Sequence, residues 1–488
     1  MLGQLQLCRK KFLFALSSMI SLSACASSSG IHPSSHLPSL NDFQVGHSIS
    51  SQVNQSKVTV RDWWKLYGDP QLNWLVAQGE EDSPSIKIAE ARIAAARAVL
   101  SGAKAEQQPQ IGGEAQLLGE YFPDHYTYSD AYAGRGGTEG EVGIDATYHF
   151  DFWGKQKQTV KASSARVIKA RYEADDATLT LQVAIVKAYI YLNQAYCERD
   201  IESEILKDQK AIVDLIHFQE QAGLENDISA VGAEQALTIT RSDLAQTNSK
   251  IIKIKNEISA LLGKGPGFGD KIARPLILSA SDPSPISVIP AKLLGYRPDV
   301  EASRAEVEVR ASEIGVAHAA FYPNVNLVGF AGLKAISIDT LFRANSIAAS
   351  IGPAVTLPIF DAGELRSKLK IRDAEYDESV NRYTETIAAA LQQVSDAIAG
   401  LRAARVNQQQ MYKADSYWAH VVHLEKAREL TGLSSNFELL SAEISFLNSE
   451  GSIIKSDADI AVEQVSLVYA LGGVWNPVHQ LHDTETIK

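Results

Sequence analysis

Few residues of this 488-residue chain occur in patterns that are known to carry out chemistry. The sequence has no Gly-x-Ser-x-Gly elbow, phosphate-binding loop, His-Glu-x-x-His motif or paired-cysteine motif. Its 11 histidines are scattered, so each is more readily a surface or core residue than a metal ligand. We therefore expect no enzyme activity, no catalytic residues, no metal site and no cofactor, although sequence alone leaves open an acid pair among the 58 acidic residues.

Cys25 is the residue for which we expect a covalent modification. A basic stretch, Arg9-Lys10-Lys11, precedes an apolar run over residues 12–22 that ends in Leu22-Ser23-Ala24-Cys25. This order is typical of a secretory signal and is too short for a membrane-spanning helix. It resembles the lipobox of bacterial lipoproteins, in which the cysteine becomes the N-terminus and carries acyl chains. Ala26, rather than Asp, then implies the outer membrane; the alternative is an ordinary signal peptide with an incidental cysteine.

The composition is that of a secreted protein with a large core. Hydrophobic residues make up 45% of the chain, and its length exceeds one ordinary domain. A net charge of −12 argues against nucleic acid as a partner. After processing, Cys197 is the remaining free cysteine, so no disulfide within the chain is expected.

The sequence repeats itself at a fixed spacing of 209 residues, as between Gly154 and Gly363 (363 − 154). Further pairs at this spacing are Gly223-Leu224 with Gly432-Leu433, Ala233-Glu234 with Ala442-Glu443, and Leu262-Gly263 with Leu471-Gly472. One structural unit is therefore predicted to occur twice in tandem, with a period far longer than that of a solenoid.

Each repeat contains a pair of predicted strands. Residues 141–150 alternate between an apolar face, which includes Val142 and Ile144, and a polar face, which includes Glu141, Asp145 and Thr147. Residues 110–121 form the partner strand, and residues 325–331 and 347–359 are their counterparts in the second repeat. This alternation is expected both of a membrane barrel strand with a wet lumen and of a half-buried soluble strand.

The stretches that follow the strands predict very long helices. Residues 155–222 contain neither Gly nor Pro, and residues 364–431 contain one Gly and no Pro. A helix of that length would extend roughly 100 Å, which belongs in a coiled coil or a tube. The chain should turn at Gly223-Leu224 and return as a helix over residues 228–262. Shorter helices are expected over residues 85–107 and 298–321, each leading into a strand pair.

The order of these elements and several short motifs resemble the TolC-type outer-membrane efflux channels, specifically their lipoprotein branch. The motifs are Trp63-Trp64 with Asp69-Pro70, Asp151-Phe152-Trp153-Gly154-Lys155, Arg297-Pro298-Asp299-Val300, Phe321-Tyr322-Pro323, Phe360-Asp361-Ala362-Gly363-Glu364, and Leu471-Gly472-Gly473 with Trp475. The resemblance covers almost the whole mature chain.

The resemblance implies an α+β membrane protein. Its fold would be a homotrimeric 12-stranded outer-membrane β-barrel, with four strands per chain, continued by a long periplasmic α-helical tunnel. The residues independently require several chains, because four strands cannot close a barrel and an open edge is not viable in lipid. The expected partners are outer-membrane lipid, a periplasmic adaptor protein and an inner-membrane transporter.

The candidate site residues lie around the two Gly-Leu turns. By resemblance, Gly223, Leu224, Gly432 and Leu433 form the adaptor-docking tip; the simpler alternative is that both glycines only cap helices. Leu433 and Phe437 are four apart on the helix expected after the turn and would share a face. The resemblance places them at the pore gate with Glu438, whereas spacing alone is equally consistent with helix packing.

The gate chemistry of this chain departs from that of many relatives. Ser441 stands where many carry an acidic residue, and Glu429 and Ser434 stand where some close the tunnel with a Tyr and an Arg. An acidic ring at 441 is therefore unavailable. Trp63 and Trp64 are interpreted as buried aromatic residues with no role in transport.

These elements predict the organisation of the chain. Residues 1–24 would form the signal peptide and residues 25–84 a lipid-anchored tether. The first repeat would cover residues 85–290, the second repeat residues 291–477, and the C-terminal tail residues 478–488. The predicted function is an outer-membrane exit channel of a tripartite efflux system, which passively conducts small toxic compounds or drugs. The channel of a type I protein secretion system is the alternative on the same fold. A lipid-anchored helical scaffold without a pore is the alternative from another class.

Overall fold

The structure is a computed structural model that describes residues 27–38, 43, 62–125, 129–276 and 297–473. Cys25, Trp475 and the predicted signal peptide and C-terminal tail lie outside these residues. The helices are η2 (Trp63–Tyr67), α3 (Pro70–Asp82), α4 (Pro84–Ala105), α5 (Lys155–Gln221), α6 (Asp227–Leu261), η3 (Pro266–Lys271), α7 (Pro298–Ala319), α8 (Ile338–Leu341), η5 (Ala344–Ser346), α9 (Glu364–Leu430) and α10 (Asn436–Ala470).

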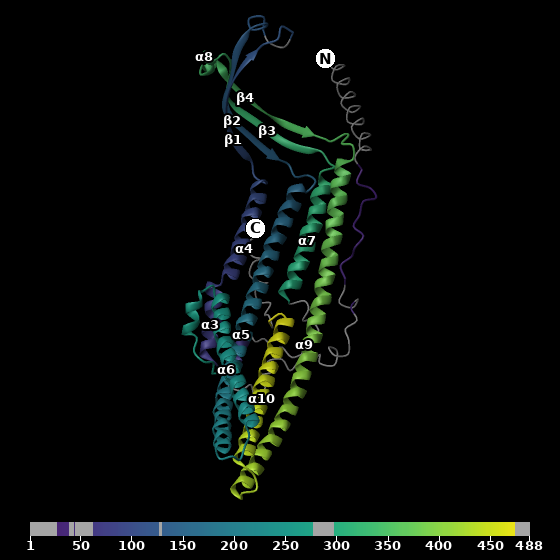
Figure 1. Ribbon diagram of the computed structural model, residues 1–488. Coiled ribbons are helices and arrows are strands. Elements are labelled where there is room, and N and C mark those ends of the chain that lie inside the picture. The colour runs from purple at the N-terminus through teal and green to yellow at the C-terminus, as the bar shows by residue number, and fades with distance from the viewer. Residues whose placement is uncertain (1–26, 39–42, 44–61, 126–128, 277–296, 474–488) are drawn as a thin grey trace. The chain divides into compact units, whose positions relative to one another are not determined.

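Four strands form one antiparallel sheet in the order β1-β2-β3-β4 (Figure 1). They are β1 (Gln110–Tyr121), β2 (Gly136–His149), β3 (Asn324–Ile336) and β4 (Ile347–Thr356). Strands β1 and β4 each pair on one side only, so the sheet of a single chain has two free edges. Four strands per chain were predicted from the sequence.

The register of the sheet keeps the two predicted faces separate across all four strands. Ile144 on β2 lies opposite Gly113 on β1 and Ala331 on β3. Ala331 in turn lies opposite Ala349 on β4. On the other face Glu141 is paired with Gln116 and with Lys334. Because side chains alternate along each strand, one face of the sheet is mainly apolar and the other carries most of its polar groups.

The spacing of 209 residues recurs in the bounds of the long helices. Helix α5 begins 209 residues before α9 (364 − 155), and α6 begins 209 residues before α10 (436 − 227). Both α5 and α9 have 67 residues, and both α6 and α10 have 35. The chain therefore builds the same helical hairpin twice.

The ends of these helices are set by local chemistry. Gly154, Gly223, Gly363 and Gly432 all have positive φ, the left-handed conformation that glycine adopts without strain. At the start of α5 the Asp151 carboxylate accepts hydrogen bonds from the backbone N–H groups of Gln156 and Lys157, at 3.1 and 2.8 Å. These bonds satisfy donors that have no partner within the helix.

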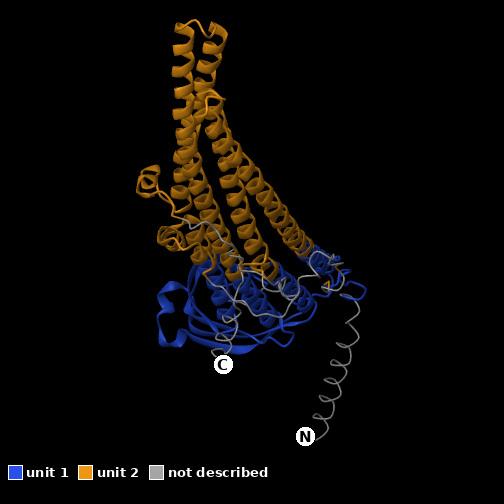
Figure 2. Cartoon of the chain, turned by 90° about the horizontal axis from the view of Figure 1, so that it is seen from below, with its two compact units in different colours: residues 1–37, 93–170, 303–384 blue, residues 38–92, 171–302, 385–488 orange. Residues whose placement is uncertain are grey.

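The described chain divides into two compact units, and Figure 2 colours them blue and orange. Unit 1 comprises residues 1–37, 93–170 and 303–384 and contains the sheet. Unit 2 comprises residues 38–92, 171–302 and 385–488 and contains the helical turns.

The largest hydrophobic core lies in unit 2. Trp63 and Trp64 are 2% and 6% exposed and pack there with residues of α3, α5, α6 and α10. The predicted tether, residues 25–84, thus includes two folded elements, η2 and α3. Asp69 begins α3 by accepting a hydrogen bond from the backbone N–H of Gln71, and it also accepts one from the Tyr189 hydroxyl at 2.6 Å.

In the described part of the chain, no helix combines the length and the apolar character needed to cross a membrane.

Candidate functional site

The two Gly-Leu turns have the same geometry at the ends of α5 and α9. The Leu224 N–H donates to the Gln219 carbonyl at 2.8 Å, and the Leu433 N–H donates to the Arg428 carbonyl at 2.9 Å. These bonds, with the left-handed glycine before each leucine, are the Schellman helix ending. Leu224 and Leu433 are 75% and 73% exposed, so each turn presents an apolar side chain to its surroundings.

The first turn is flanked by a histidine that connects α5 to α6. His217 lies 3.1 Å from a carboxylate oxygen of Glu220 and, through its other nitrogen, 3.3 Å from one of Glu234. Hydrogen bonds to these two carboxylates raise the pKa of His217. The protonated imidazole can donate to both carboxylates, which links the two arms of the hairpin.

The second turn is held by different residues. Arg428 donates to Glu425 at 2.6 Å, and Ser434 donates to the other oxygen of Glu425 at 2.7 Å. Ser435 and Glu438 then form a capping box, in which the Ser435 N–H donates to the Glu438 carboxylate at 3.0 Å. Glu438 is thus occupied in starting α10.

The structure contradicts one part of the predicted gate, the placement of Leu433 on the helix that follows the turn. Helix α10 begins at Asn436, so Leu433 lies in the turn and not on the helix with Phe437. The prediction that Leu433 and Phe437 share one helix face is therefore wrong. The capping box decides the boundary, because Ser435 ends the turn and fixes the first helical residue. Phe437 is 41% exposed, and within one chain neither side chain is buried.

The residues that replace the common gate groups have local roles. The Ser441 carbonyl accepts a hydrogen bond from the Ser445 hydroxyl at 2.9 Å, one turn later in α10. The Glu429 carbonyl accepts the Gly432 N–H at 3.0 Å and so belongs to the helix ending.

Arg297, which the sequence offered only as a family marker, is a central connector of unit 2. Its guanidinium is buried and donates to both oxygens of Asp299, at 3.0 and 2.7 Å. It also donates to the Ala470 carbonyl at 2.7 Å and to Gln393 at 2.8 Å. One side chain thereby joins the start of α7 to the end of α10 and to α9. Local spacing gave no signal of this role, because Gln393 and Ala470 are 96 and 173 positions from Arg297.

In unit 1 the markers around the strand ends also meet. The Trp153 ring stacks on Tyr322, with centroids 4.5 Å apart, and its N–H donates to the Pro323 carbonyl at 2.9 Å. The motif that ends the first strand pair therefore packs on the motif that begins the second.

An ion pair joins two strands on the polar face of the sheet. Lys334 on β3 lies 2.8 Å from the Glu141 carboxylate on β2, and its ammonium lies 5.5 Å from the centre of the Phe330 ring. A Cβ atom on Gly143 would lie 2.5 Å from the Phe330 ring, so glycine at 143 makes room for that ring.

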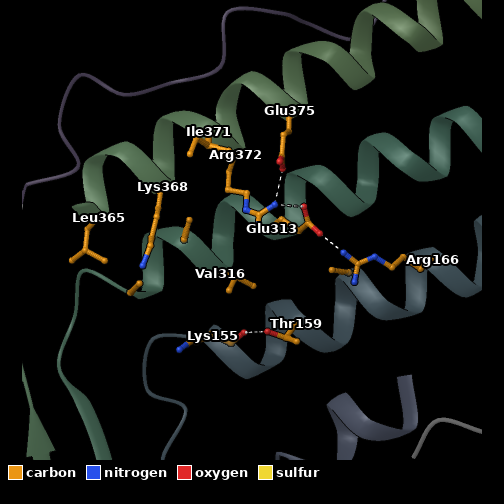
Figure 3. A pocket seen from close by; sticks show the side chains of 13 residues that line it. Lys155, Thr159, Arg166, Glu313, Val316, Leu365, Lys368, Ile371, Arg372 and Glu375 are labelled. Atoms are coloured by element: carbon orange, nitrogen blue, oxygen red, sulfur yellow. Dashed lines mark hydrogen bonds and ion pairs between the residues drawn. The ribbon is translucent and has the colours of Figure 1, made fainter. Parts of the chain in front are cut away.

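A pocket of about 460 Å³ lies in unit 1 among α5, α7 and α9 (Figure 3). Its lining is mainly apolar but includes charged side chains. Glu313 binds Arg166, Arg310 and Arg372, and Arg372 also reaches Glu375 at 2.6 Å. These three arginines and two glutamates come from α5, α7 and α9, so the network ties the three helices together.

Among the described residues, no group of three or more His, Cys, Asp or Glu side chains is placed to hold a metal ion. The candidate features are therefore the two turns in unit 2, and the ion-paired helices and the two-faced sheet in unit 1.

Comparisons with known proteins agree with this architecture. The sequence profile described as "Outer membrane efflux protein" matches residues 75–264 and 289–473. The fusaric acid resistance protein FusA of Burkholderia cepacia is 33% identical over 367 residues, which is 74% of this chain and 69% of FusA. The probable outer membrane lipoprotein SilC of Salmonella typhimurium is 25% identical over 475 residues, which is 95% of this chain and 98% of SilC. The crystal structure of the outer membrane protein VceC of Vibrio cholerae superposes with a TM-score of 0.77 at 29% identity, covering 85% of this chain and 99% of VceC.

The fold and the comparisons define a channel subunit of the bacterial outer membrane. The chain belongs to the outer membrane efflux protein family. The expected fold class, a trimeric barrel of four strands per chain continued by a helical tunnel, is confirmed, as is the function of an efflux exit channel. The efflux relatives favour this function over protein secretion and over a scaffold without a pore.

Proposed function

We propose that this protein is the exit channel of a tripartite efflux system. In this proposal it passively conducts small toxic compounds or drugs, which an inner-membrane transporter delivers through a periplasmic adaptor. FusA is named for resistance to fusaric acid, which is consistent with a small organic toxin as cargo.

The observation that carries the proposal is the pair of exposed turns. Two hairpins of equal length end in Gly-Leu turns with the same hydrogen bonds, and each exposes a leucine. An apolar residue at a fixed helix ending costs little entropy to bind, because the turn is already ordered. We assign Gly223, Leu224, Gly432 and Leu433 to the surface that docks the adaptor.

Replacing Leu224 by Asp should impair docking without closing the pore. The change puts a charge on a surface that must lose water on docking, so we expect efflux-dependent resistance to fall by at least about tenfold, the effect of about 1.4 kcal/mol in binding. Leu224→Met, which keeps the apolar character, should retain resistance. The measurement is drug susceptibility set beside single-channel conductance of the purified trimer. Unchanged resistance in Leu224→Asp would remove this turn from the docking surface.

We further propose that Leu433 and Phe437 narrow the tunnel. Each would occur three times around the axis of the trimer, and an apolar ring of that kind can exclude water and ions by dewetting. Both side chains are available for this role because they are exposed in the single chain. Glu438 would lie beside the ring, with its carboxylate occupied by Ser435.

The double variant Leu433→Ala, Phe437→Ala should conduct better than the unmodified channel. A wider ring lowers the barrier to hydration, so conductance per trimer in a planar bilayer should rise and cells should become sensitive to large antibiotics. The control is trimer yield, because side chains packed between helices would instead leave cavities that cost several kcal/mol. Reduced yield with unchanged conductance would place the constriction elsewhere.

We also propose that Cys25 carries the lipid anchor. The order of basic, apolar and Leu-Ser-Ala-Cys residues supports it, and the relative SilC is described as a probable lipoprotein. Mass spectrometry of the mature N-terminus should find acyl chains on Cys25, and Cys25→Ser should lose them while strand burial still allows insertion. An unmodified start at another residue would refute the assignment.

A further inference from the structure

The N-terminal segment, residues 27–37, is seated on α7 and α9 in unit 1. Ile31 is 5% exposed and packs in a small core with Phe321 and Leu369. Arg366, in the first turn of α9, donates to the Ser27 carbonyl. The segment is drawn in purple beside α9 in Figure 1.

A single carboxylate holds the other end of the segment. Asp377 accepts the backbone N–H of Ser34 at 3.0 Å and that of Ser35 at 2.8 Å. It also accepts the Ser34 hydroxyl at 2.7 Å. Burial works against the charge, but these hydrogen bonds prevail and lower the pKa of Asp377. Ion–dipole bonds of this kind are stronger than bonds between neutral groups.

The register of the segment on α9 follows from these contacts. Leu369, Asp373 and Asp377 are four residues apart, so they lie along one face of the helix. Eight helical residues rise about 12 Å, which an extended segment covers in about four residues. Since Ile31 meets Leu369 and Ser34 meets Asp377, His32 and Pro33 lie over Asp373.

Asp373 is the unusual group beneath the segment. It is 6% exposed, and among the described residues neither of its carboxylate oxygens has a hydrogen-bond partner. The titratable groups that face it are His318 of α7, Asp377 of α9 and His32 of the segment. None of them binds it directly, so an ionised Asp373 is a desolvated charge, which is costly.

We propose that residues 27–37 and this face of α9 form a proton-dependent clasp: docking of the segment covers the Asp373 carboxyl, so the segment binds more tightly when that carboxyl is protonated. The proposal concerns how the N-terminal segment is attached to α9 and does not depend on which compound is transported.

The direction of the pH effect follows from the two carboxyls. Burial raises the pKa of Asp373, His318 and His32 oppose the rise, and Asp377 adds to it. A group whose pKa is higher in the docked state takes up a proton on docking, so docking strengthens as pH falls through the docked value. Asp377 has the opposite effect, because its pKa is lowered when the segment is docked. Its stabilisation of the docked state is lost only as the pH falls toward that lower pKa. Docking should therefore be tightest at mildly acidic pH.

The test measures docking in the full-length trimer with a nitroxide label on the segment. The label is attached through His36→Cys, at an exposed position, in a Cys197→Ser background, and the same background without His36→Cys is the labelling control. Adding Ile31→Ala weakens docking enough for both states to be populated. The fraction of immobilised label, read by electron paramagnetic resonance, should rise from pH 8 to pH 5, with about a tenfold change in the docking equilibrium for each unit of pKa difference.

Variants identify the group responsible. Asp373→Asn should keep the segment docked across the pH range and remove the pH dependence. Asp377→Asn, one turn away, should weaken docking at every pH and retain the dependence. His32→Gln and His318→Gln should retain the pH dependence as well, since each removes a group that lowers the pKa of Asp373. A flat profile in the parent, or a slope that survives in Asp373→Asn, would overturn the proposal. If Asp373→Asn fails to assemble, Asp373→Ser makes the same test. The titration of the parent protein does not depend on either variant, and a flat profile there is enough to overturn the proposal.

Discussion

Replacing Arg297 by Ala should nearly abolish the assembled trimer. Arg297 is buried and makes four hydrogen bonds, to Asp299, Gln393 and the Ala470 carbonyl. Removing Arg297 leaves the buried Ala470 carbonyl without its donor and the half-buried Asp299 carboxylate without its cation. Each buried polar group left unsatisfied costs about 1–3 kcal/mol. Arg297 also acts on Asp176 of α5. Burial raises the pKa of Asp176, the Asp299 carboxylate adds to the rise, and the Arg297 guanidinium opposes it. The loss would therefore extend to α5.

The measurement is the amount of trimer in outer membranes and its thermal midpoint. Arg297→Lys keeps the charge but not the planar fork, so it should be intermediate. Lys207→Ala is the matched control, since it breaks an ion pair with Glu204 that lies on the surface, where such pairs contribute little. Trimer levels equal to those of the Lys207 variant would show that Arg297 is not the connector described above.

A charge on the apolar face of β2 should have the second-largest effect. Ile144 is flanked by Gly113 and Ala331 on that face, and it is 57% exposed in the single chain. If this face meets lipid, Ile144→Arg should cost about 2–4 kcal/mol near the midplane of the membrane. Thr147 lies on the opposite face, between Gln110 and Val328, so Thr147→Arg should be milder.

Assembled trimer in outer membranes distinguishes the two substitutions. Equal losses from Ile144→Arg and Thr147→Arg would contradict the assignment of the faces. Ile144→Leu, which changes shape but not polarity, separates packing from charge and should assemble normally.

The regular elements were predictable from the sequence because their signals are local. The stretch after Gly154 lacks Gly and Pro, and the stretch after Gly363 has only Gly400; this pattern predicted the helices that the structure gives as α5 and α9. Alternation in residues 141–150 predicted the two faces of β2, although the strand ends at His149, one residue early. Hydrophobic period and glycine spacing are properties of neighbouring residues, so no tertiary information was needed.

Contacts between distant segments were not predictable. Asp377 and Ser34 are separated by 343 positions, and no motif links them. Arg297 and the Ala470 carbonyl are likewise far apart in the sequence, by 173 positions, and no motif links them. One local signal was present in the sequence but was not used. Ser435 and Glu438 have the spacing of a capping box, which places the start of α10 after Leu433, whereas Glu438 was interpreted as a gate residue.

The equal lengths of the two hairpins have a consequence for symmetry. Two hairpins per chain in a trimer give six endings with nearly the same backbone, an approximate sixfold arrangement. The side chains divide these six endings into two alternating sets. One set contains the contact between His217 and Glu234, and the other contains the ion pair between Arg428 and Glu425. A partner surface that met all six endings would thus encounter two kinds of contact, and one of them contains His217, whose pKa the hydrogen bonds to Glu220 and Glu234 raise toward neutrality.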